Sequence, residues 1–187
     1  MSTSPPSPES PFPPGGQPSG AWVLELERQA RRHGSGIGAA ELTGPWELRH
    51  LWGRERATPQ ESPATLLRLL GARLAISPGD LPGNPLQLCN SVRIGALELR
   101  FLGWGRLVGR RPLLQFGFER LELRLGPRLL LQRSLPPGDP RRQPFFALIA
   151  SGADGQGRWL LARGRGGGLA CWRCPSADAG EQLAAQR

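Results

Sequence analysis

The sequence predicts a mainly β protein: an antiparallel β-barrel of about eight strands, with an N-terminal helix and a disordered, proline-rich N-terminal tail. Three observations predict this fold. The 187 residues include 26 glycines and 20 prolines, so turns are frequent and the elements short. Apolar residues follow a helical spacing near the start of the chain. From Gly44 onward they mostly alternate with polar residues, which is the period of a half-buried strand.

The first 41 residues divide into a tail and a helical segment. Residues 1–20 contain seven prolines and few apolar side chains, so they cannot offset the entropy of ordering, and we expect them to be disordered. Trp22, Leu26 and Ala30 then recur every four residues, which predicts an amphipathic helix. We interpret residues 21–41 as this helix and a linker.

The barrel domain is expected over residues 42–174 and a flexible tail over 175–187. In the first strand, alternation should place four side chains on one face: Trp46, Leu48, His50 and Trp52. Residues 62–74 carry leucines at helical spacing, which favours a short helix or lid between the first strands.

The middle of the domain contains three longer alternating segments. Residues 86–94 and 97–101 predict two half-buried antiparallel strands. In residues 114–125 the apolar positions change from even to odd numbers. We predict that a bulge near Glu119 and Arg120, or a turn, resets the face of this strand.

Four further short strands are predicted at residues 128–132, 145–151, 159–163 and 169–173. Segments rich in Gly, Pro and Asp separate them, as turns require. We interpret residues 164–168 as a hairpin turn and not a phosphate loop, because no helix or Lys-Ser/Thr pair follows. About eight strands make a small closed barrel whose interior can hold one ligand.

The charge of the chain is strongly basic. The formal net charge is +9, and residues 44–174 hold 20 arginines against nine acidic residues, with no lysine. Such a surface attracts anionic partners, including nucleic acid and acidic lipid headgroups, without specifying one. Arginine clusters in loops would contact lipid phosphate or the nucleic-acid backbone; more commonly, such clusters only form a hydrated surface that keeps a protein soluble. The expected loop clusters are Arg106, Arg110 and Arg111, and Arg141 and Arg142.

Cysteine content and targeting patterns bear on localisation. Cys89, Cys171 and Cys174 are too few for a secreted disulfide scaffold and favour a reducing compartment. The N-terminal residues carry neither a secretory signal nor an arginine-rich transit pattern. The longest apolar run, residues 145–150, is shorter than a membrane span. We expect a cytoplasmic protein that is soluble or peripheral at a membrane.

Three segments resemble one known family. Residues 42–48, Leu-Thr-Gly-Pro-Trp-Glu-Leu, are similar to the Leu-x-Gly-x-Trp-x-Leu opening strand of the plastid lipid-associated protein (PAP/fibrillin) family, and contain the Gly-x-Trp of lipocalins. Residues 159–173 resemble the family's final hairpin, and Asn84 or Asn90 fits its Asn-bearing middle strand. The chain departs from the family at residues 49–52, Arg-His-Leu-Trp, where many members carry Tyr-Thr-Ser.

The resemblance implies a lipocalin-like barrel that binds a lipid, quinone or carotenoid and associates with thylakoid membranes of a photosynthetic cell. The missing transit pattern then implies a cyanobacterial member of the family. In lipocalins the opening tryptophan closes one barrel end. A late arginine, here Arg163 or Arg173, would stack on the ring of Trp46; the alternative is a plain core tryptophan.

Aromatic side chains on the strands supply the candidate ligand site, because an apolar pocket with few polar groups suits a lipid chain or isoprenoid. The same pattern also suits an ordinary packed core. The candidate ligand-binding residues are Trp46, Trp52, Phe101, Trp104, Phe116, Phe118, Arg163 and Trp172.

No catalytic or metal site is predicted. Cys171 and Cys174 look like half of a zinc site, but residues three apart on a strand point to opposite faces, and no second pair follows. His33 and His50 lie in no motif with a nucleophile or a carboxylate. We expect neither enzyme activity nor a cofactor.

Two functions remain open at this point. The first is non-catalytic binding of an apolar small molecule, with an arginine-rich rim facing an anionic membrane. The alternative is an arginine-rich module with a solid core that binds an acidic protein or nucleic acid, without specific nucleic-acid recognition. Lipid or pigment in a solvent extract would favour the first, and steep salt dependence without lipid uptake the second.

Overall fold

The computed structural model describes residues 18–52, 73–81 and 83–175. Most of both expected tails and most of the expected helix at residues 62–74 therefore lie outside the described residues. The helical elements are α1 (Gly20–His33), α2 (Ala39–Leu42) and the 3₁₀ helix η1 (Pro140–Arg142). The strands are β1 (Gly44–Trp52), β2 (Arg73–Leu81), β3 (Asn84–Ile94), β4 (Leu97–Val108), β5 (Leu113–Leu125), β6 (Arg128–Ser134), β7 (Phe145–Asp154), β8 (Gly157–Gly164) and β9 (Leu169–Pro175).

Helix α1 forms where the sequence predicts it. It begins after Ser19, whose hydroxyl accepts a hydrogen bond from the backbone N–H of Trp22 at 3.3 Å. The helix ends at Gly34, whose φ of 84° suits glycine. Its most buried stripe is Val23, Glu27 and Ala30, so the first two positions lie one residue beyond the predicted Trp22 and Leu26. No helix in the described part of the chain has the length and apolar character of a membrane span.

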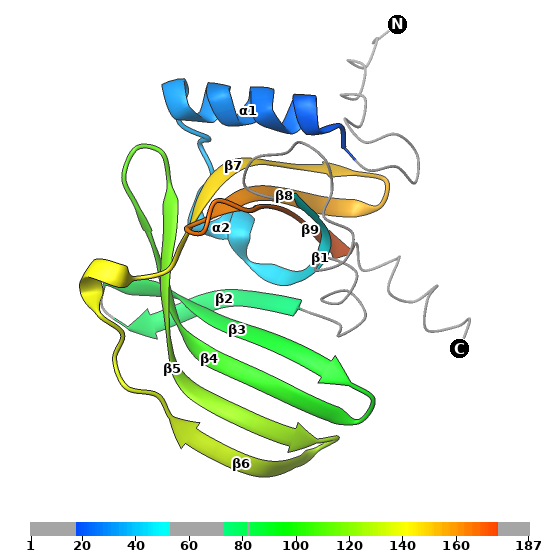
Figure 1. The fold of residues 1–187 in the computed structure, drawn as a ribbon, viewed down its shortest axis with the longest axis vertical. Helices are drawn as coiled ribbons and strands as arrows, with labels where there is room; N and C mark the ends of the chain where they lie inside the picture. Colours follow the sequence, from blue (N-terminus) through cyan, green and yellow to red (C-terminus); the bar gives the residue numbers. More distant parts are fainter. Residues whose placement is uncertain (1–17, 53–72, 82, 176–187) are drawn as a thin grey trace, which may run out of the picture.

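The nine strands form one antiparallel sheet that closes in a ring (Figure 1). The order is β4-β3-β2-β1-β9-β8-β7-β5, and the pairing of β4 with β5 completes the circuit. Strand β6 lies outside it, paired with β5. Helix α1 covers one side of the ring beside β7 (Figure 1). The mainly β prediction is thus confirmed, and each of the eight predicted strands is present in a sheet that has nine.

Strand β2 is the ninth strand, which the sequence analysis missed. The expected helix reached residue 74, but Arg73 and Leu74 begin β2, so this boundary was wrong. β2 pairs with β1 and β3 and buries Leu74 and Ile76. The physical reason is tertiary pairing, which overrides a leucine pattern that fits a helix equally well.

Two apolar cores lie on the two faces of the sheet. The inner core fills the ring around Trp46, Leu48 and Trp172. The outer core lies beneath α1 and includes Val23 and Trp52. The sheet therefore buries one face inside the ring and part of the other against the helix.

The prediction that Trp46, Leu48, His50 and Trp52 share a face was wrong. In the pairing with β9, Leu48 is opposite Trp172 and His50 is opposite Cys171, so Arg49 is an extra residue in β1. This bulge turns over the faces that follow it. Trp52 consequently joins the outer core.

The predicted bulge at Glu119 and Arg120 is confirmed. Leu102 is opposite Arg120 and Gly103 is opposite Phe118, which leaves Glu119 without a partner on β4. Phe118 and Leu121 can therefore both lie on the inner face although their numbers differ in parity.

Candidate ligand-binding site

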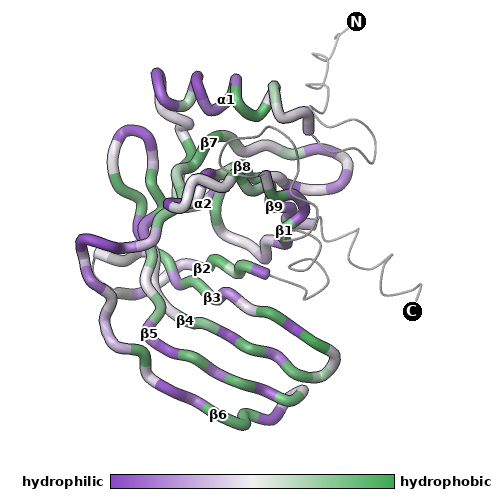
Figure 2. The backbone as a smooth tube through the Cα atoms, viewed as in Figure 1, coloured by the Kyte–Doolittle hydropathy of each residue, from purple (hydrophilic) through white to green (hydrophobic). Residues whose placement is uncertain are grey.

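The four strands β3 to β6 extend below the ring as a curved arm (Figure 1), which we define as residues 90–101 and 118–134. The strand registers place most apolar side chains of the arm on its inner face, which continues the inside of the ring; Arg128 and Arg133 of β6 lie opposite inner-face leucines. Alternating colours along these strands in Figure 2 show the same period. The inner-face residues are Val92, Ile94, Leu97, Leu99, Phe101, Leu121, Leu123, Leu125 and Leu131.

This inner face is exposed toward the end of the arm. Ile94 is 62% exposed, Leu125 46% and Leu131 52%. None of the described elements covers these three side chains. Soluble proteins rarely expose contiguous apolar surface without a ligand or a partner for it.

The outer face of the arm carries ion pairs instead. Glu98 pairs with Arg100 at 2.8 Å and with Arg93 at 3.4 Å. Glu122 pairs with Arg120 at 3.1 Å and with Arg124 at 3.5 Å. Burial raises the pKa of Glu98, but the hydrogen bonds and positive charges of Arg100 and Arg93 outweigh this effect, so the net shift of the pKa is downward. These arginines are therefore engaged within the sheet.

A row of aromatic rings connects the arm to the inner core. Ring centroids are 5.7 Å apart between Phe101 and Phe118, and 5.6 Å between Phe118 and Phe116. The row continues from Phe116 to Phe146 at 5.1 Å and from Phe146 to Trp172 at 6.3 Å. Four of the expected ligand-binding residues thus come together. Phe146 was missed, since in its apolar segment neighbouring residues of both faces are apolar.

Trp46 lies in the inner core, but the arginine over its ring is not one of those expected. The guanidinium carbon of Arg158 lies 5.2 Å from the centre of the Trp46 ring. Arg158 also donates hydrogen bonds to the carbonyl oxygens of Thr43, at 2.6 Å, and Glu41, at 3.2 Å. The indole N–H of Trp46 donates to the carbonyl oxygen of Leu42 at 2.6 Å. Trp46 is 1% exposed, so its ring is part of the core.

Arg163 and Arg173, the two arginines expected on Trp46, have other partners. Arg163 binds the carboxylate of Glu27 on α1, on the outer side of the sheet. Arg173 pairs with Asp154 at 2.6 Å. Both expectations were wrong because Arg163 and Arg173 alternate with inward residues such as Ala162 and Trp172, so they lie on the outer face of the sheet and not on the side of Trp46.

Glu27 is the centre of a buried charge cluster. Arg163 donates to it from two nitrogens, at 2.6 and 2.5 Å, Arg31 at 2.9 Å and Arg111 at 3.4 Å. Burial raises the pKa of Glu27, but hydrogen bonds and charge from Arg163 and Arg31 outweigh it and lower the pKa to about 2. This cluster was not predicted, since Glu27 looked like a polar-face residue of the helix.

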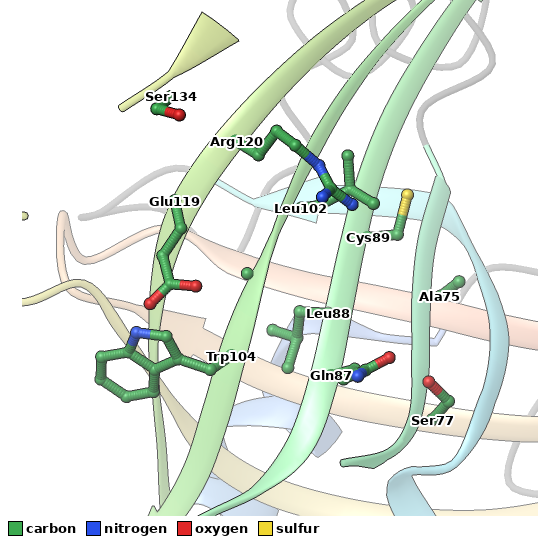
Figure 3. A pocket seen from close by; sticks show the side chains of 11 residues that line it. Ala75, Ser77, Gln87, Leu88, Cys89, Leu102, Trp104, Glu119, Arg120 and Ser134 are labelled. Atoms are coloured by element: carbon green, nitrogen blue, oxygen red, sulfur yellow. The ribbon is translucent and has the colours of Figure 1, made fainter. Parts of the chain in front are cut away.

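Trp104, another expected ligand residue, faces away from the aromatic row. Its ring lies against Gly117, where an added Cβ would be 3.1 Å from the indole, and Arg106 lies 5.8 Å from the ring centre. In Figure 3 the Glu119 side chain points toward this indole. Trp104 and Glu119 border two hollows of about 390 and 700 Å³ on the outer side. The larger hollow is bounded by the Leu135–Pro144 segment.

The arginine clusters only partly lie in loops. Arg106 is within β4, which corrects the expectation, whereas Arg110 and Arg111 lie in the β4–β5 turn. Arg111 is engaged with Glu27. Arg141 and Arg142 lie in η1.

The cysteines and histidines form no reactive constellation in the described residues. Cys171 belongs to the outer core and Cys174 to the inner core, so their side chains lie on opposite faces as predicted. Burial raises the pKa of the Cys171 thiol to about 12, which suppresses its thiolate. Nowhere in the described ranges do three His, Cys, Asp or Glu side chains gather as they would around a metal ion.

Comparison of the chain with family models, with curated proteins and with solved structures gives no match. The likeness to the PAP/fibrillin family therefore rests on the sequence segments alone.

Proposed function

We propose that this protein is a lipocalin-like barrel that binds an apolar small molecule, such as a lipid, quinone or carotenoid, without catalysing a reaction. The observation that carries the proposal is the continuity between the exposed inner face of the arm and the aromatic row. An apolar chain lying on Leu99 and Leu123 would reach Phe101 and Phe118 without crossing a polar surface.

The ligand is expected at the arm end of the ring and not at its centre. Around Trp46 the inner core is filled by side chains, including Leu148 at 0% exposure. Phe101, Phe118 and Phe146 are only half-buried, which leaves ring surface for a ligand. Burying about 200 Å² of apolar surface at about 25 cal/mol per Å² would supply about 5 kcal/mol toward binding.

An apolar ligand in a cell comes from a membrane, so the proposal includes peripheral contact with an anionic membrane. The family resemblance suggests that this membrane is the thylakoid membrane.

The alternative function, binding of an acidic partner through arginines, has less support. Many arginines in the described residues have internal partners, among them Arg93, Arg100, Arg120, Arg124, Arg158, Arg163 and Arg173.

The first experiment identifies the ligand. The protein is purified from its native cell and extracted with organic solvent, and the extract is analysed for pigment, quinone and acyl lipid. We expect a stoichiometric apolar compound. An empty extract from a well-folded sample, together with steeply salt-dependent binding to nucleic acid, would overturn the proposal in favour of the alternative.

The second experiment locates the site by uptake of a fluorescent fatty acid. Phe101→Arg places a charge on the inner face, and we expect a loss of affinity of at least about tenfold, since 1.4 kcal/mol corresponds to that factor. Leu102→Arg is the matched control, because Leu102 is the next residue on β4 and faces outward. Equal uptake by both variants, each folded by circular dichroism, would contradict the assignment of the inner face.

A further inference from the structure

The free end of the arm consists of two hairpin turns that lie side by side (Figure 1). We define the arm tip as residues 93–97, which contain the β3–β4 turn, and residues 125–131, which contain the β5–β6 turn. Both loops are tight and have only two residues. The backbone N–H of Gly126 donates a hydrogen bond to the carbonyl oxygen of Ala96 at 2.8 Å. The two turns are therefore joined into one surface.

Exposed apolar side chains are concentrated in the arm tip. In the part of the chain that the structure describes, six of the seven large apolar residues that are exposed belong to it. The seventh, Val108, lies at the opposite end of β4. The tip protrudes from the sheet (Figure 1), a shape that can enter the headgroup region of a bilayer. The six exposed residues of the tip are Ile94, Leu97, Leu125, Leu129, Leu130 and Leu131.

The charges of the tip are positive only. Its twelve residues include Arg93 and Arg128 and no acidic residue, and the whole arm has six arginines and three glutamates, a net charge of +3. Two of these glutamates, Glu98 and Glu122, are buried and engaged with arginines of the sheet. Arg133, further along β6, is exposed like Arg128.

This combination of apolar side chains and exposed guanidinium groups is complementary to an anionic bilayer. The boundary between headgroups and acyl chains takes apolar side chains, and the headgroup phosphates attract arginines. Nucleic acid would neutralise the arginines but give the six apolar side chains no apolar environment. A second copy of the chain would bring the arginines together, which is unfavourable.

We propose that the arm tip inserts into the headgroup region of an anionic bilayer. The inference names the contact surface for the membrane association in the proposed function, and in that respect rests on it. The inner face of the arm would then open onto the bilayer, because Ile94, Leu97 and Leu125 belong to both surfaces. A lipid chain leaving the bilayer along this face would reach Phe101 over apolar side chains.

Co-sedimentation of the delipidated full-length protein with vesicles tests the docking. One set of vesicles is an equal mixture of phosphatidylcholine and phosphatidylglycerol, and the other is phosphatidylcholine alone. We expect binding to the anionic vesicles that weakens with salt, and much weaker binding to the neutral ones. Absence of binding to the anionic vesicles at low salt would overturn the proposal.

Charge substitutions locate the contact. Ile94→Asp should lower the partition coefficient for anionic vesicles at least about tenfold, because an apolar side chain no longer enters the bilayer. Val108→Asp is the matched control, since it adds the same charge at the exposed apolar residue on the opposite end of β4. Equal losses in the two variants, each folded by circular dichroism, would overturn the proposal.

Arginine substitutions test the electrostatic part. Arg128→Gln should weaken binding to the anionic vesicles about fivefold at low salt. Arg110→Gln, in the β4–β5 turn, removes the same charge away from the tip and should have a smaller effect. Equal losses for the two arginines would show that net charge and not the tip directs binding, which contradicts the proposal.

An environment-sensitive fluorescent label tests insertion directly. A nitrobenzoxadiazole group on Ile94→Cys should shift its emission to shorter wavelength when anionic vesicles are added, and the same group on Val108→Cys should not. The native protein, labelled in the same way, gives the background from Cys89, which is half-buried. The same shift at both positions would argue against insertion by the tip.

Uptake of a soluble fluorescent fatty acid without vesicles separates this inference from the proposed function. Protein that takes up the fatty acid but does not bind vesicles would overturn the docking alone. Protein that binds vesicles through Ile94 but takes up no fatty acid would support the docking and overturn the ligand site. A dimer in sedimentation velocity that Ile94→Asp breaks, without vesicle binding, would assign the tip to a second copy and overturn the docking.

Discussion

Arg163 on β8 holds the carboxylate of Glu27 on α1 with two hydrogen bonds, of 2.6 and 2.5 Å, across 136 residues of sequence. Both side chains are largely buried, at 17% and 4% exposure. Two parallel N–H···O bonds between a guanidinium and a carboxylate are strong and directional. The helix is therefore fixed to the outside of the ring by a specific charge pair as well as by apolar packing.

The first prediction concerns this pair. Glu27→Gln removes the negative charge and leaves three arginines around a neutral side chain, so we expect the free energy of unfolding to fall by about 3 kcal/mol. Urea denaturation measures it. Glu25→Gln on the same helix is the control, because Glu25 and its partner Arg28 are about half exposed, and its effect should stay below about 0.5 kcal/mol. Equal effects of the two substitutions would contradict a special role for Glu27.

The second prediction is a pH dependence. The pKa of Glu27 is about 2 in the folded state and 4.5 as its ordinary value. The carboxylate therefore stabilises the fold above pH 4.5, and this contribution of about 3 kcal/mol is lost as the pH falls toward 2. The difference in unfolding free energy between the native protein and Glu27→Gln should narrow over this range. A constant difference in urea titrations between pH 5 and pH 2 would be inconsistent with the lowered pKa.

The third prediction concerns the contacts that Arg158 makes around Trp46. Arg158→Lys keeps the charge but loses the guanidinium that reaches two carbonyl oxygens and the Trp46 ring, so we expect a loss of about 1 to 2 kcal/mol. Thermal and urea unfolding measure the change. The control is Arg106→Lys, since Arg106 is exposed and lies over Trp104, and we expect under about 0.5 kcal/mol. A neutral Arg158→Lys would show that the charge alone suffices.

The fourth prediction concerns packing between β4 and β5. A Cβ at Gly103 would lie 1.8 Å from the carbonyl oxygen of Gly117, which is backbone and cannot move freely. Gly103→Ala should destabilise the protein by at least about 2 kcal/mol. Gly138→Ala meets nothing within 4 Å and should be close to neutral in the same unfolding assay. A neutral Gly103→Ala would mean that the two strands are further apart than described.

Strand identity was predictable where side chains alternate cleanly. The change from even to odd apolar positions in β5 predicted the bulge at Glu119, because only an extra residue keeps Phe118 and Leu121 on one face of the strand. The bulge at Arg49 gave no such signal. Leu51 and Trp52 are both apolar, so either could have been the inward residue, and the sequence analysis chose wrongly for Trp52.

The candidate site was predictable only in part. Phe101, Phe116, Phe118 and Trp172 come together because strand parity places them all inside. The arginine on Trp46 could not be deduced, since Arg158 and Arg163 lie on opposite faces of β8 and the residues between them, 159–162, are apolar on both faces. Only the structure shows that the even-numbered residues of β8, Arg158 among them, lie on the side of Trp46.

The pairing of β1 with β9 brings Glu47 beside Arg173, so the first strand of the domain finds its neighbour in the last. During synthesis β1 must wait for almost all of the domain to emerge from the ribosome before the circle can be completed. Until then the apolar faces of the strands between β1 and β9 are not covered by a completed ring. A nascent chain of this kind depends on rapid completion, or on a chaperone, to escape aggregation.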